Sequence, residues 1–296
     1  MSQPTEKILL TGATGFLGSH LLKSLVQHDK ACIVLKRSTS DTGRIAGLLK
    51  KVDFYDSDKV TFEEIFKTHS VDWIIHCATN YGRRGENLSE ILEANLQFPL
   101  KLLQSASRCG LKGFINVDTA LKSSTNAYSL SKKQFLEWLT TFSRTLKTFN
   151  LRFEQFYGPN DSDSKFTTRV IQNLAKSVDK MDFTLGEQKR EFLYIDDAIQ
   201  AILTVLQQSA HFGKGLHEFE VGSGQSVSIR EFVQLVKEIS QNQNTQLNFG
   251  AIPYSENELM NSQMDISRLV SLGWTPKVGL AEGIQKTIQL SEGHHG

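Results

Sequence analysis

The sequence predicts an α/β protein with a doubly wound, mainly parallel sheet and helices on both faces. Short apolar runs alternate with longer segments of helical periodicity through the first half of the chain. A glycine-rich turn joins the first apolar run to the first helical segment. With 296 residues, 39% of them hydrophobic, the chain is long enough to bury a substantial core.

Six apolar runs of strand length define the expected sheet. They are Lys7 to Leu10, Ala31 to Leu35, Val52 to Tyr55, Val71 to Cys77, Phe114 to Val117 and Leu151 to Phe156. The helical segments between them are Leu17 to Gln27, Thr42 to Leu49, Lys59 to Thr68, Leu88 to Cys109 and Ala127 to Lys147. Because a helix between two strands of one sheet returns the chain to the starting edge, this alternation predicts parallel strands.

After Gly158 and Pro159 the alternation becomes less regular, with polar loops between short helices and strands. We therefore expect a first domain over residues 1–160, to which later segments contribute, and a smaller α/β lobe over 161–292. Residues 293–296 are interpreted as a tail.

Composition excludes several classes of protein. With 33 basic and 32 acidic residues, the chain lacks the field that attracts nucleic acid or an anionic membrane. The three cysteines are isolated and no cluster has metal-ligand spacing, which favours a reducing cytoplasm and no metal site. No apolar stretch reaches the roughly 20 residues of a transmembrane helix. We expect a cytoplasmic protein without nucleic-acid or membrane partners.

The turn from Thr11 to Gly18 has the spacing of a dinucleotide-binding loop. Gly12 allows the tight turn, Gly15 lets the backbone approach a pyrophosphate, and Gly18 lets helix and strand pack closely. The alternative is a glycine-rich turn without a ligand, which its place between a strand and a helix disfavours. The residues expected to bind the cofactor here are Gly12, Thr14, Gly15, Phe16, Leu17 and Gly18.

The end of the second strand predicts which dinucleotide binds. A site selective for NAD usually has Asp or Glu here, to accept the ribose hydroxyls. This chain has Lys36, Arg37 and Ser38, which suit a 2′-phosphate through charge-assisted hydrogen bonds. The alternative is an ordinary solvated loop. We expect the cofactor to be NADP(H).

Tyr128 and Lys132 are four residues apart at the start of a helical segment, so both side chains lie on one helix face. A phenol has a pKa of about 10 and becomes an acid/base near neutrality only beside a cation, which Lys132 supplies. Thr119, at the end of the fifth strand, provides a hydroxyl that orients a substrate carbonyl. These three residues are the expected catalytic group.

The motifs Thr-Gly-x-x-Gly-x-x-Gly at 11–18, Tyr-x-x-x-Lys at 128–132 and Leu-Arg-Phe-Glu-Gln-Phe-Tyr-Gly-Pro at 151–159 resemble the extended short-chain dehydrogenases/reductases, the NAD-dependent epimerase/dehydratase family. The resemblance covers nearly the whole chain and implies a Rossmann-type sheet. It implies Tyr128 as general acid/base, Lys132 as its cation and ribose ligand, and Thr119 as their hydroxyl partner. The other cofactor residues that it implies are Asp53 and Phe54 near the adenine, Ala78, Asn95 in a supporting role, and Phe153 beside the nicotinamide.

Two positions depart from the family pattern. The strand end reads Asn-Val-Asp-Thr119 and the following loop is short, so Ser123 and Ser124 are alternatives to Thr119 as the hydroxyl. Gln155 stands where relatives commonly carry Asn, and its predicted contact is with the substrate phosphate.

The stretch 183–197 resembles the segment that contacts the nucleotide diphosphate in sugar-modifying members of the family. It implies Arg190 as the diphosphate ligand, with Arg268 and Lys165 as weaker candidates; for Lys165 we prefer a surface charge. Asp196 and Asp197 precede a helical stretch and are interpreted as its N-cap and first-turn residues. His76, at the end of a buried strand, is expected to be structural.

The family contains epimerases, dehydratases and reductases. No acid follows Thr119, which disfavours a dehydratase, and Lys36 and Arg37 disfavour an epimerase that recycles bound NAD. The expected activity is reduction by NADPH of the 4-keto group of a CDP-, dTDP- or UDP-linked 6-deoxyhexose, in bacterial surface-polysaccharide (lipopolysaccharide O-antigen) synthesis. The alternatives are a nucleotide-sugar epimerase with tightly bound NAD(P) and a non-catalytic NADP-sensing scaffold.

The two longest helical segments carry more apolar residues than one buried face requires, among them Phe98, Leu102, Phe135, Trp138 and Phe142. Such a helix pair predicts a two-fold interface, and the resemblance also implies a homodimer.

Overall fold

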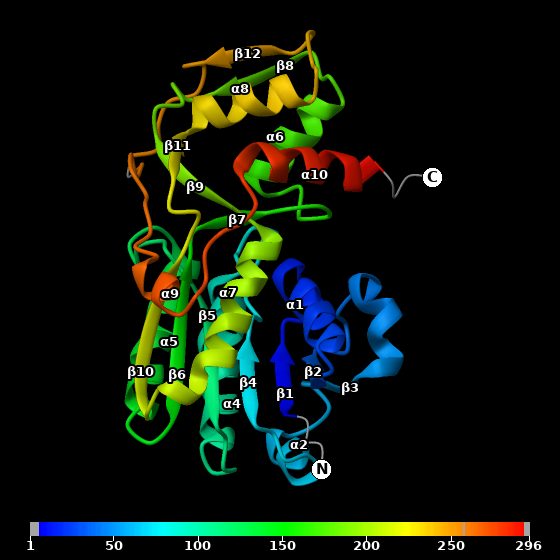
Figure 1. Cartoon of the computed structure of the whole chain (residues 1–296), viewed down its shortest axis with the longest axis vertical. Helices are drawn as coiled ribbons and strands as arrows, with labels where there is room; N and C mark the ends of the chain where they lie inside the picture. The colour runs from blue at the N-terminus through cyan, green and yellow to red at the C-terminus, as the bar shows by residue number, and fades with distance from the viewer. Residues whose placement is uncertain (1–5, 257, 293–296) are drawn as a thin grey trace. The chain divides into compact units, whose positions relative to one another are not determined.

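The computed structural model describes residues 6–256 and 258–292, so the predicted tail at 293–296 lies outside the described residues. The chain forms two compact units. The first comprises Met1–Arg152 and Ile202–Phe219, and the second comprises Phe153–Ala201 and Glu220–Gly296. The first continuous segment of the first unit thus ends at Arg152, earlier than the expected boundary at 160. The later segment Ile202–Phe219 also belongs to this unit. Figure 1 labels the elements.

A seven-stranded sheet with the order β10-β6-β5-β4-β1-β2-β3 runs through the first unit (Figure 1). The strands are β1 (Lys7–Thr11), β2 (Ala31–Lys36), β3 (Asp53–Asp56), β4 (Trp73–His76), β5 (Gly113–Thr119), β6 (Lys147–Phe153) and β10 (Gly215–Val221). β1 pairs in parallel with both β2 and β4, so the strand order reverses there. Ligands bind at such switch points, outside the carboxyl ends of the strands. The predicted doubly wound α/β fold is confirmed.

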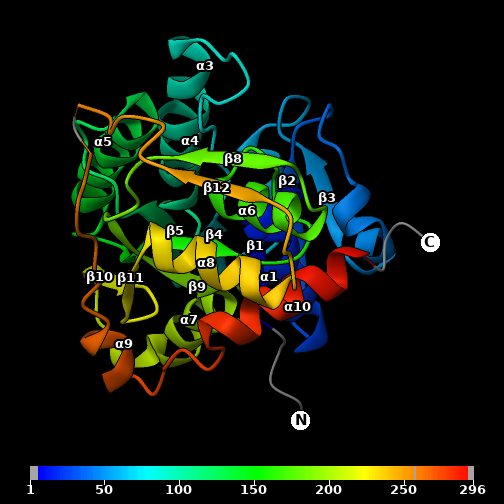
Figure 2. The same ribbon diagram turned by 90° about the horizontal axis from the view of Figure 1, so that it is seen from above.

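Helices cover both faces of this sheet. They are α1 (Phe16–Gln27), η1 (Gly43–Lys51), α2 (Phe62–Thr68), α3 (Leu88–Leu92), η2 (Glu93–Gln97), α4 (Phe98–Ala106), α5 (Ala127–Phe142) and the end of α7 (Ile195–Gln207). Figures 1 and 2 show α4 and α5 on one face and α1 on the other. Alternate strand residues point to opposite faces, so Leu9, Ile74 and Phe114 meet Leu102 and Phe135 in one buried cluster.

The boundary between α5 and β6 differs from the prediction. α5 ends at Phe142, and the residues from Lys147 onward form β6 rather than the end of a helix. β6 lies between β10 and β5, and Thr148, Phe149, Asn150 and Leu151 are all buried. A strand covered on both faces shows no alternation of apolar and polar residues, so its sequence lacks a strand period.

The apolar residues proposed for a dimer interface are mostly core residues. Leu102 and Phe135 are fully buried, and Phe98 and Phe142 pack against the same cluster. Trp138 is the exception, with 47% of its surface exposed. The apparent excess of apolar residues on these helices therefore fills the core beneath the sheet.

The second unit contains two small sheets and several helices. Its elements are β7 (Gln155–Tyr157), α6 (Phe166–Ala175), β8 (Lys180–Phe183), β9 (Lys189–Tyr194), the start of α7, β11 (Ser226–Ser228), α8 (Ile229–Ile239), β12 (Gln246–Phe249), α9 (Ser267–Ser271) and α10 (Leu280–Glu292). The sheets have the orders β11-β9-β7 and β12-β8. The ring of Phe192 stacks on Phe232 of α8 at 4.1 Å, which joins a sheet to the helix.

Asp196 and Asp197 both lie in the first turn of α7, which begins at Ile195. The buried Asp197 carboxylate accepts hydrogen bonds from the amides of Lys277 and Val278, at 3.0 and 2.9 Å. Asp197 therefore anchors a distant loop of the same unit, whereas Asp196 is exposed, and neither residue precedes the helix as an N-cap. Within the described residues, no helix is long and apolar enough to span a membrane.

Candidate active site

The glycine-rich turn follows β1 and begins α1. Gly12 has a φ of +72°, and a Cβ there would lie 2.5 Å from the backbone nitrogen of Ala78. A Cβ on Gly18 would lie 2.1 Å from the carbonyl oxygen of Gly12. Gly15 is exposed, and among the described residues no side chain caps the N-terminus of α1. Amide donors and the positive end of the helix dipole are thus presented at the carboxyl edge of the sheet, where a pyrophosphate fits.

His76 and Thr11 fix the chain behind this turn. The Thr11 hydroxyl lies 2.8 Å from Nδ1 of His76 and accepts a hydrogen bond from the amide of Ala78 at 3.2 Å. Burial holds the pKa of His76 well below its usual range, so the imidazole is neutral. Ala78 follows β4 directly below Gly12, beside the predicted cofactor position. His76 is structural, as expected from its place after a buried strand.

The residues after β2 are more constrained than the sequence indicated. The Lys36 ammonium pairs with the carboxylate of Asp56 at 2.5 Å, and the Ser38 hydroxyl and amide donate to Asp58 at 2.5 and 2.7 Å. Arg37 is exposed and, within the described residues, makes no ion pair. The two carboxylates were missed, although Lys36 and Asp56 are register partners at the ends of β2 and β3. Of this basic pair, Lys36 is therefore held by a carboxylate and Arg37 is not.

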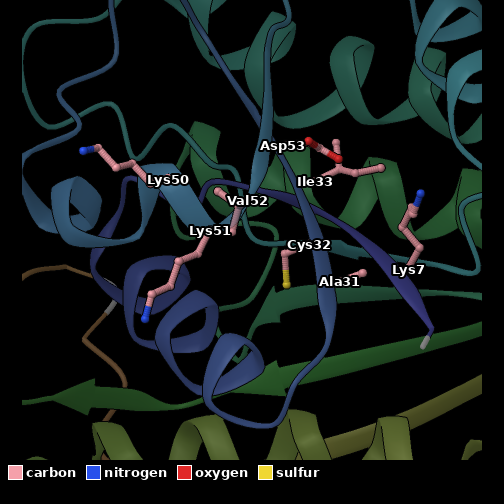
Figure 3. Close-up of a pocket in the computed structure, with 8 residues that line it drawn as sticks. All are labelled: Lys7, Ala31, Cys32, Ile33, Lys50, Lys51, Val52 and Asp53. Carbon is pink, nitrogen blue, oxygen red and sulfur yellow. The ribbon is translucent and has the colours of Figure 1, made fainter. Parts of the chain in front are cut away.

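The placement of Asp53 near the adenine is wrong. Asp53 is the first residue of β3, so it lies at the amino edge of the parallel sheet, whereas the glycine-rich turn lies at the carboxyl edge. Figure 3 shows Asp53 in a pocket with Lys7 and Ala31, the first residues of β1 and β2. Phe54 is half exposed, and Lys36 lies 5.7 Å above its ring. Of this strand, Asp56 is the residue at the edge that faces the turn.

Thr119, at the end of β5, meets Tyr128 at the start of α5, and Lys132 follows one turn later on the same helix. Asn126 caps α5 and forms a reciprocal capping box with Ser129, which fixes where Tyr128 enters the helix. Burial raises the pKa of Tyr128 well above its usual range, and a hydrogen bond with Thr119 acts in the opposite direction. Ser123 and Ser124 are exposed. Thr119 is therefore the hydroxyl that meets the phenol.

Lys132 is 1% exposed, and burial lowers its pKa while the carboxylate of Asp118 opposes that change. Among the described residues, no group hydrogen-bonds to its ammonium. A buried ammonium with unused donors suits the hydroxyls of a ribose. Both this side chain and the glycine-rich turn therefore fit a nicotinamide dinucleotide.

A buried network supports Thr119 from behind. The ammonium of Lys133 donates to Asp118 at 3.0 Å and to the carbonyl of Thr119 at 2.8 Å. Asp118 also accepts from the Thr119 amide at 2.7 Å and from Asn150 at 3.1 Å. These contacts fix the end of β5, and with it the position of the Thr119 hydroxyl. Neither Asp118 nor Lys133 was predicted as a site residue.

Asn95 supports the site without facing it. Its amide nitrogen donates to the carbonyl of Asn80 at 2.8 Å and to the Ser131 hydroxyl at 3.0 Å, and its oxygen accepts from the amide of Asn80 at 2.7 Å. Asn95 is fully buried in the π-helical turn η2. Pro99, four residues later, cannot donate to the carbonyl of Asn95, which accounts for the change of helix type. Asn95 thus fastens the loop after β4 to α5.

Four further predicted residues lie in the second unit. Phe153 is buried and packs edge-to-face on Phe156, at 5.7 Å. Gln155 is partly buried in β7, in register with Phe192 of β9. Arg268 is exposed on α9, and the Lys165 ammonium pairs with Asp161 at 2.9 Å.

Arg190, the predicted diphosphate ligand, is already paired. Its guanidinium binds the carboxylate of Glu258 at 2.6 Å and donates to the carbonyls of Lys189 and Leu259. Three of the five guanidinium donors are thus engaged, so a diphosphate at this end of Arg190 would compete with Glu258. This pair was not predicted, since Arg190 and Glu258 lie on separate segments of the chain.

A cavity of about 440 Å³ opens within the second unit, between α6 and β8. Its walls include Phe166 and Arg169 of α6, Phe183 and Thr184, and Gln188. The last three belong to the stretch that resembles a nucleotide-contacting segment. The aromatic and polar walls suit a ligand with a flat ring and hydrogen-bonding edges.

Comparisons with known proteins agree with the motifs. The profile of the NAD dependent epimerase/dehydratase family matches residues 8–222. A CDP-abequose synthase of Salmonella muenchen is 31% identical over 301 residues, which cover 99% of this chain and 100% of the relative. A dTDP-D-glucose 4,6-dehydratase of Mus musculus is 26% identical over 96% of this chain and 88% of its own length.

Solved structures share the fold. UDP-glucuronic acid 4-epimerase from Bacillus cereus, in complex with UDP-glucuronic acid and NAD, superposes with a TM-score of 0.84 at 21% identity, over 97% of this chain and 99% of the other. UDP-glucose 4-epimerase from Thermotoga maritima gives a TM-score of 0.83 at 23% identity, over 98% and 100%. Taken with the family profile and the motifs at 11–18 and 128–132, these similarities show that the chain belongs to the NAD-dependent epimerase/dehydratase family.

Proposed function

We propose that the protein reduces the 4-keto group of a nucleotide-activated 6-deoxyhexose with NADPH, in the synthesis of a bacterial surface polysaccharide. The observation that carries this proposal is the buried Tyr128 phenol that hydrogen-bonds with Thr119, one helical turn before the buried Lys132. Because burial raises the pKa of Tyr128, the phenol is protonated at neutral pH. A protonated phenol is the form that a ketone reductase needs, since it donates a proton to the carbonyl oxygen.

The residues of the first unit divide the proposed reaction between them. NADPH, when bound, supplies the hydride that adds to the carbonyl carbon. Thr119 orients the carbonyl oxygen, Tyr128 gives it a proton, and Lys132 binds the ribose and favours the phenolate left on Tyr128. The uncapped N-terminus of α1 holds the pyrophosphate, and Arg37 contacts the 2′-phosphate.

Two observations favour a reductase over the other activities of the family. Residues 120–126, between Thr119 and α5, contain no carboxylic acid to remove or deliver a second proton, as a dehydratase requires. The similarity to CDP-abequose synthase extends over essentially the whole chain and favours a CDP-linked sugar. In the second unit, Gln155, Arg190 and Arg268 are the proposed phosphate ligands, and a phosphate at Arg190 would compete with Glu258.

A substrate panel tests this function. Incubation with CDP-, dTDP- and UDP-linked 4-keto-6-deoxysugars is expected to oxidise NADPH, followed by its absorbance, with the fastest rate for a CDP-sugar. NADH should bind more weakly, and Arg37→Ala should weaken NADPH binding by about tenfold while Arg108→Ala, far from the site, leaves it unchanged. No oxidation with any sugar would refute the reductase, and release of a tightly held nucleotide on denaturation would favour an epimerase.

A homodimer is part of the proposal. Leu130 and Trp138 lie eight residues apart on α5 and are each 47% exposed, so they share a helix face that solvent reaches in the single chain. Light scattering is expected to give the mass of two chains for the parent and of one chain for Trp138→Glu. A parent protein with the mass of one chain would contradict the dimer.

A further inference from the structure

The loop that follows β4 carries an aromatic ring to the catalytic tyrosine. The ring centroids of Tyr81 and Tyr128 are 4.8 Å apart, with an angle of 45° between the ring planes. Tyr81 is 38% exposed, whereas Tyr128 is 9% exposed. The Tyr81 ring therefore covers one side of Tyr128 and remains open to solvent on another.

This arrangement is held by specific contacts. The buried amide of Asn95 binds both the amide and the carbonyl of Asn80, at 2.7 and 2.8 Å. The side chain of Asn80 then accepts a hydrogen bond from the amide of Gly82 at 2.9 Å. Gly82 has a φ of +66°, a conformation that glycine adopts without strain. The loop is thus tied to the helices below it, and Tyr81 is placed by the fold rather than by chance.

Arg83 adds a cation to this ring pair. Its guanidinium carbon lies 5.3 Å from the centroid of the Tyr81 ring. Arg83 is exposed and, in the part of the chain that the structure describes, has no carboxylate partner. A guanidinium over an aromatic face is held by the negative potential of the ring while its N–H donors stay available. Arg83 thus contacts the same ring that packs against Tyr128.

We propose that Tyr81 and Arg83 are positioning residues of the reaction: Tyr81 fixes the ring of Tyr128, and Arg83 is a second cation, besides Lys132, that stabilises the Tyr128 phenolate. This inference depends on the proposed function. In the reduction, hydride from NADPH forms a C–H bond as the carbonyl π bond breaks, the carbonyl oxygen takes the phenol proton, and Tyr128 becomes a phenolate that water reprotonates. Burial raises the pKa of Tyr128 most, and the neighbouring Tyr81 and Asp118 raise it further, whereas the hydrogen bond with Thr119 and the Arg83 guanidinium lower it. A cation near the phenol thus favours the phenolate against these effects.

The sign of the expected pH shift follows from the role of Tyr128 when the reaction runs in reverse. When the product alcohol is oxidised with NADP⁺, Tyr128 is the base, so the rate rises with pH until the phenol is ionised. Without Arg83 the pKa is higher, and the rising limb moves to higher pH. If the limb moves up by about one pH unit, the rate of alcohol oxidation at any pH on that limb falls about tenfold.

The test compares Arg83→Gln, Arg83→Lys and Arg84→Gln in the full chain. Arg84 is an equally exposed neighbour whose amide, rather than its guanidinium, contacts Glu86, so it is the matched control. For Arg83→Gln we expect the rising limb of the plot of kcat against pH, for alcohol oxidation, to move to higher pH by about one pH unit. KM should change less than about twofold. Arg83→Lys should restore most of the rate, and Arg84→Gln should match the parent. A parent-like pH profile for Arg83→Gln would overturn the role of Arg83.

Tyr81 is tested by Tyr81→Phe and Tyr81→Leu. Tyr81→Leu removes the ring that packs against Tyr128 and carries Arg83, so it should lower kcat by about tenfold. Its readout is kcat rather than the position of the limb, because Tyr81 itself raises the pKa of Tyr128 and its loss opposes the loss of Arg83. Tyr81→Phe keeps the ring and should restore most of the rate that Tyr81→Leu loses. Equal kcat values for Tyr81→Leu and the parent would overturn the role of Tyr81.

A readout without substrate separates this inference from the proposed function. The ultraviolet absorbance of tyrosinate, titrated in the NADP⁺ complex and corrected with Tyr128→Phe, reports ionisation of Tyr128 directly. Arg83→Gln should raise its midpoint, and Arg84→Gln should not. A raised midpoint in a protein that reduces none of the sugars would support the role of Arg83 and refute the reductase. If Arg83→Gln left the midpoint unchanged in a protein that does reduce the sugars, the role of Arg83 would be refuted and the reductase supported.

Discussion

Replacement of Tyr128 by phenylalanine is expected to lower kcat by about 10³-fold, while NADPH binds as it does in the parent. The substitution removes the proton donor and its hydrogen bond with Thr119 but keeps the ring that packs against Tyr81. The glycine-rich turn and Lys132, which are proposed to bind the cofactor, are unchanged. NADPH affinity, measured by fluorescence, and kcat, measured by NADPH oxidation, therefore report two separate properties of the same variant.

Tyr55→Phe is the control for this substitution. Its hydroxyl lies 2.8 Å from Nε2 of His69, at a position the proposed reaction does not use, so loss of that hydroxyl should leave kcat within about twofold of the parent. If Tyr128→Phe kept more than about a tenth of the activity, Tyr128 would not be the general acid. If it also lost NADPH binding, the phenol would be part of the cofactor site.

The second large effect is expected for Gly18→Ala, which should lower the free energy of unfolding by about 3 kcal/mol and abolish measurable NADPH binding. The added Cβ would lie 2.1 Å from the carbonyl oxygen of Gly12 and 2.9 Å from Cα of Ala13, and these are backbone atoms. Relief of the overlap requires α1 to move away from the turn. That movement also displaces the helix N-terminus that is expected to bind the pyrophosphate.

Gly47→Ala is the matched control, because a Cβ on Gly47 has no atom within 4 Å and should leave both properties unchanged. Denaturant unfolding gives the stability, and NADPH fluorescence gives the affinity. Parent-like stability of Gly18→Ala would mean that helix and strand tolerate a wider separation than the structure has. Normal stability with lost binding would place Gly18 in the cofactor site alone.

The elements that the sequence predicted well are those whose pattern is local. The positions of β1, α1 and β2 followed from an apolar run, a glycine-rich turn and helical periodicity, and each boundary was within one residue of the structure. The prediction failed where burial removes the pattern. β6 is covered on both faces, so Thr148 and Asn150 are buried beside apolar neighbours and its first residues read as an extension of α5.

In the candidate site, too, residues specified by a local pattern were predicted, whereas partners from distant segments were missed. Gly12 and Gly18 were assigned from sterics within a single turn, and Tyr128 and Lys132 from one turn of helix, which their spacing specifies. Asp53 was misplaced because assigning a residue to one edge of the sheet requires the true ends of β3. The partners of Lys36, Ser38 and Arg190 were missed because Asp56, Asp58 and Glu258 come from other segments.

Periodicity, glycine sterics and helix spacing act over a few residues, so they were enough to predict the fold class, the glycine-rich turn and the proposed group of Thr119, Tyr128 and Lys132. Which charges are paired and what surrounds the phenol depended on the packing of distant segments: Lys36 and Arg190 pair with carboxylates, Tyr81 packs on Tyr128, and Arg83 lies over Tyr81. Such contacts join residues far apart in the chain. They depend on strand register and on loop anchors such as Asn95, which no local pattern encodes.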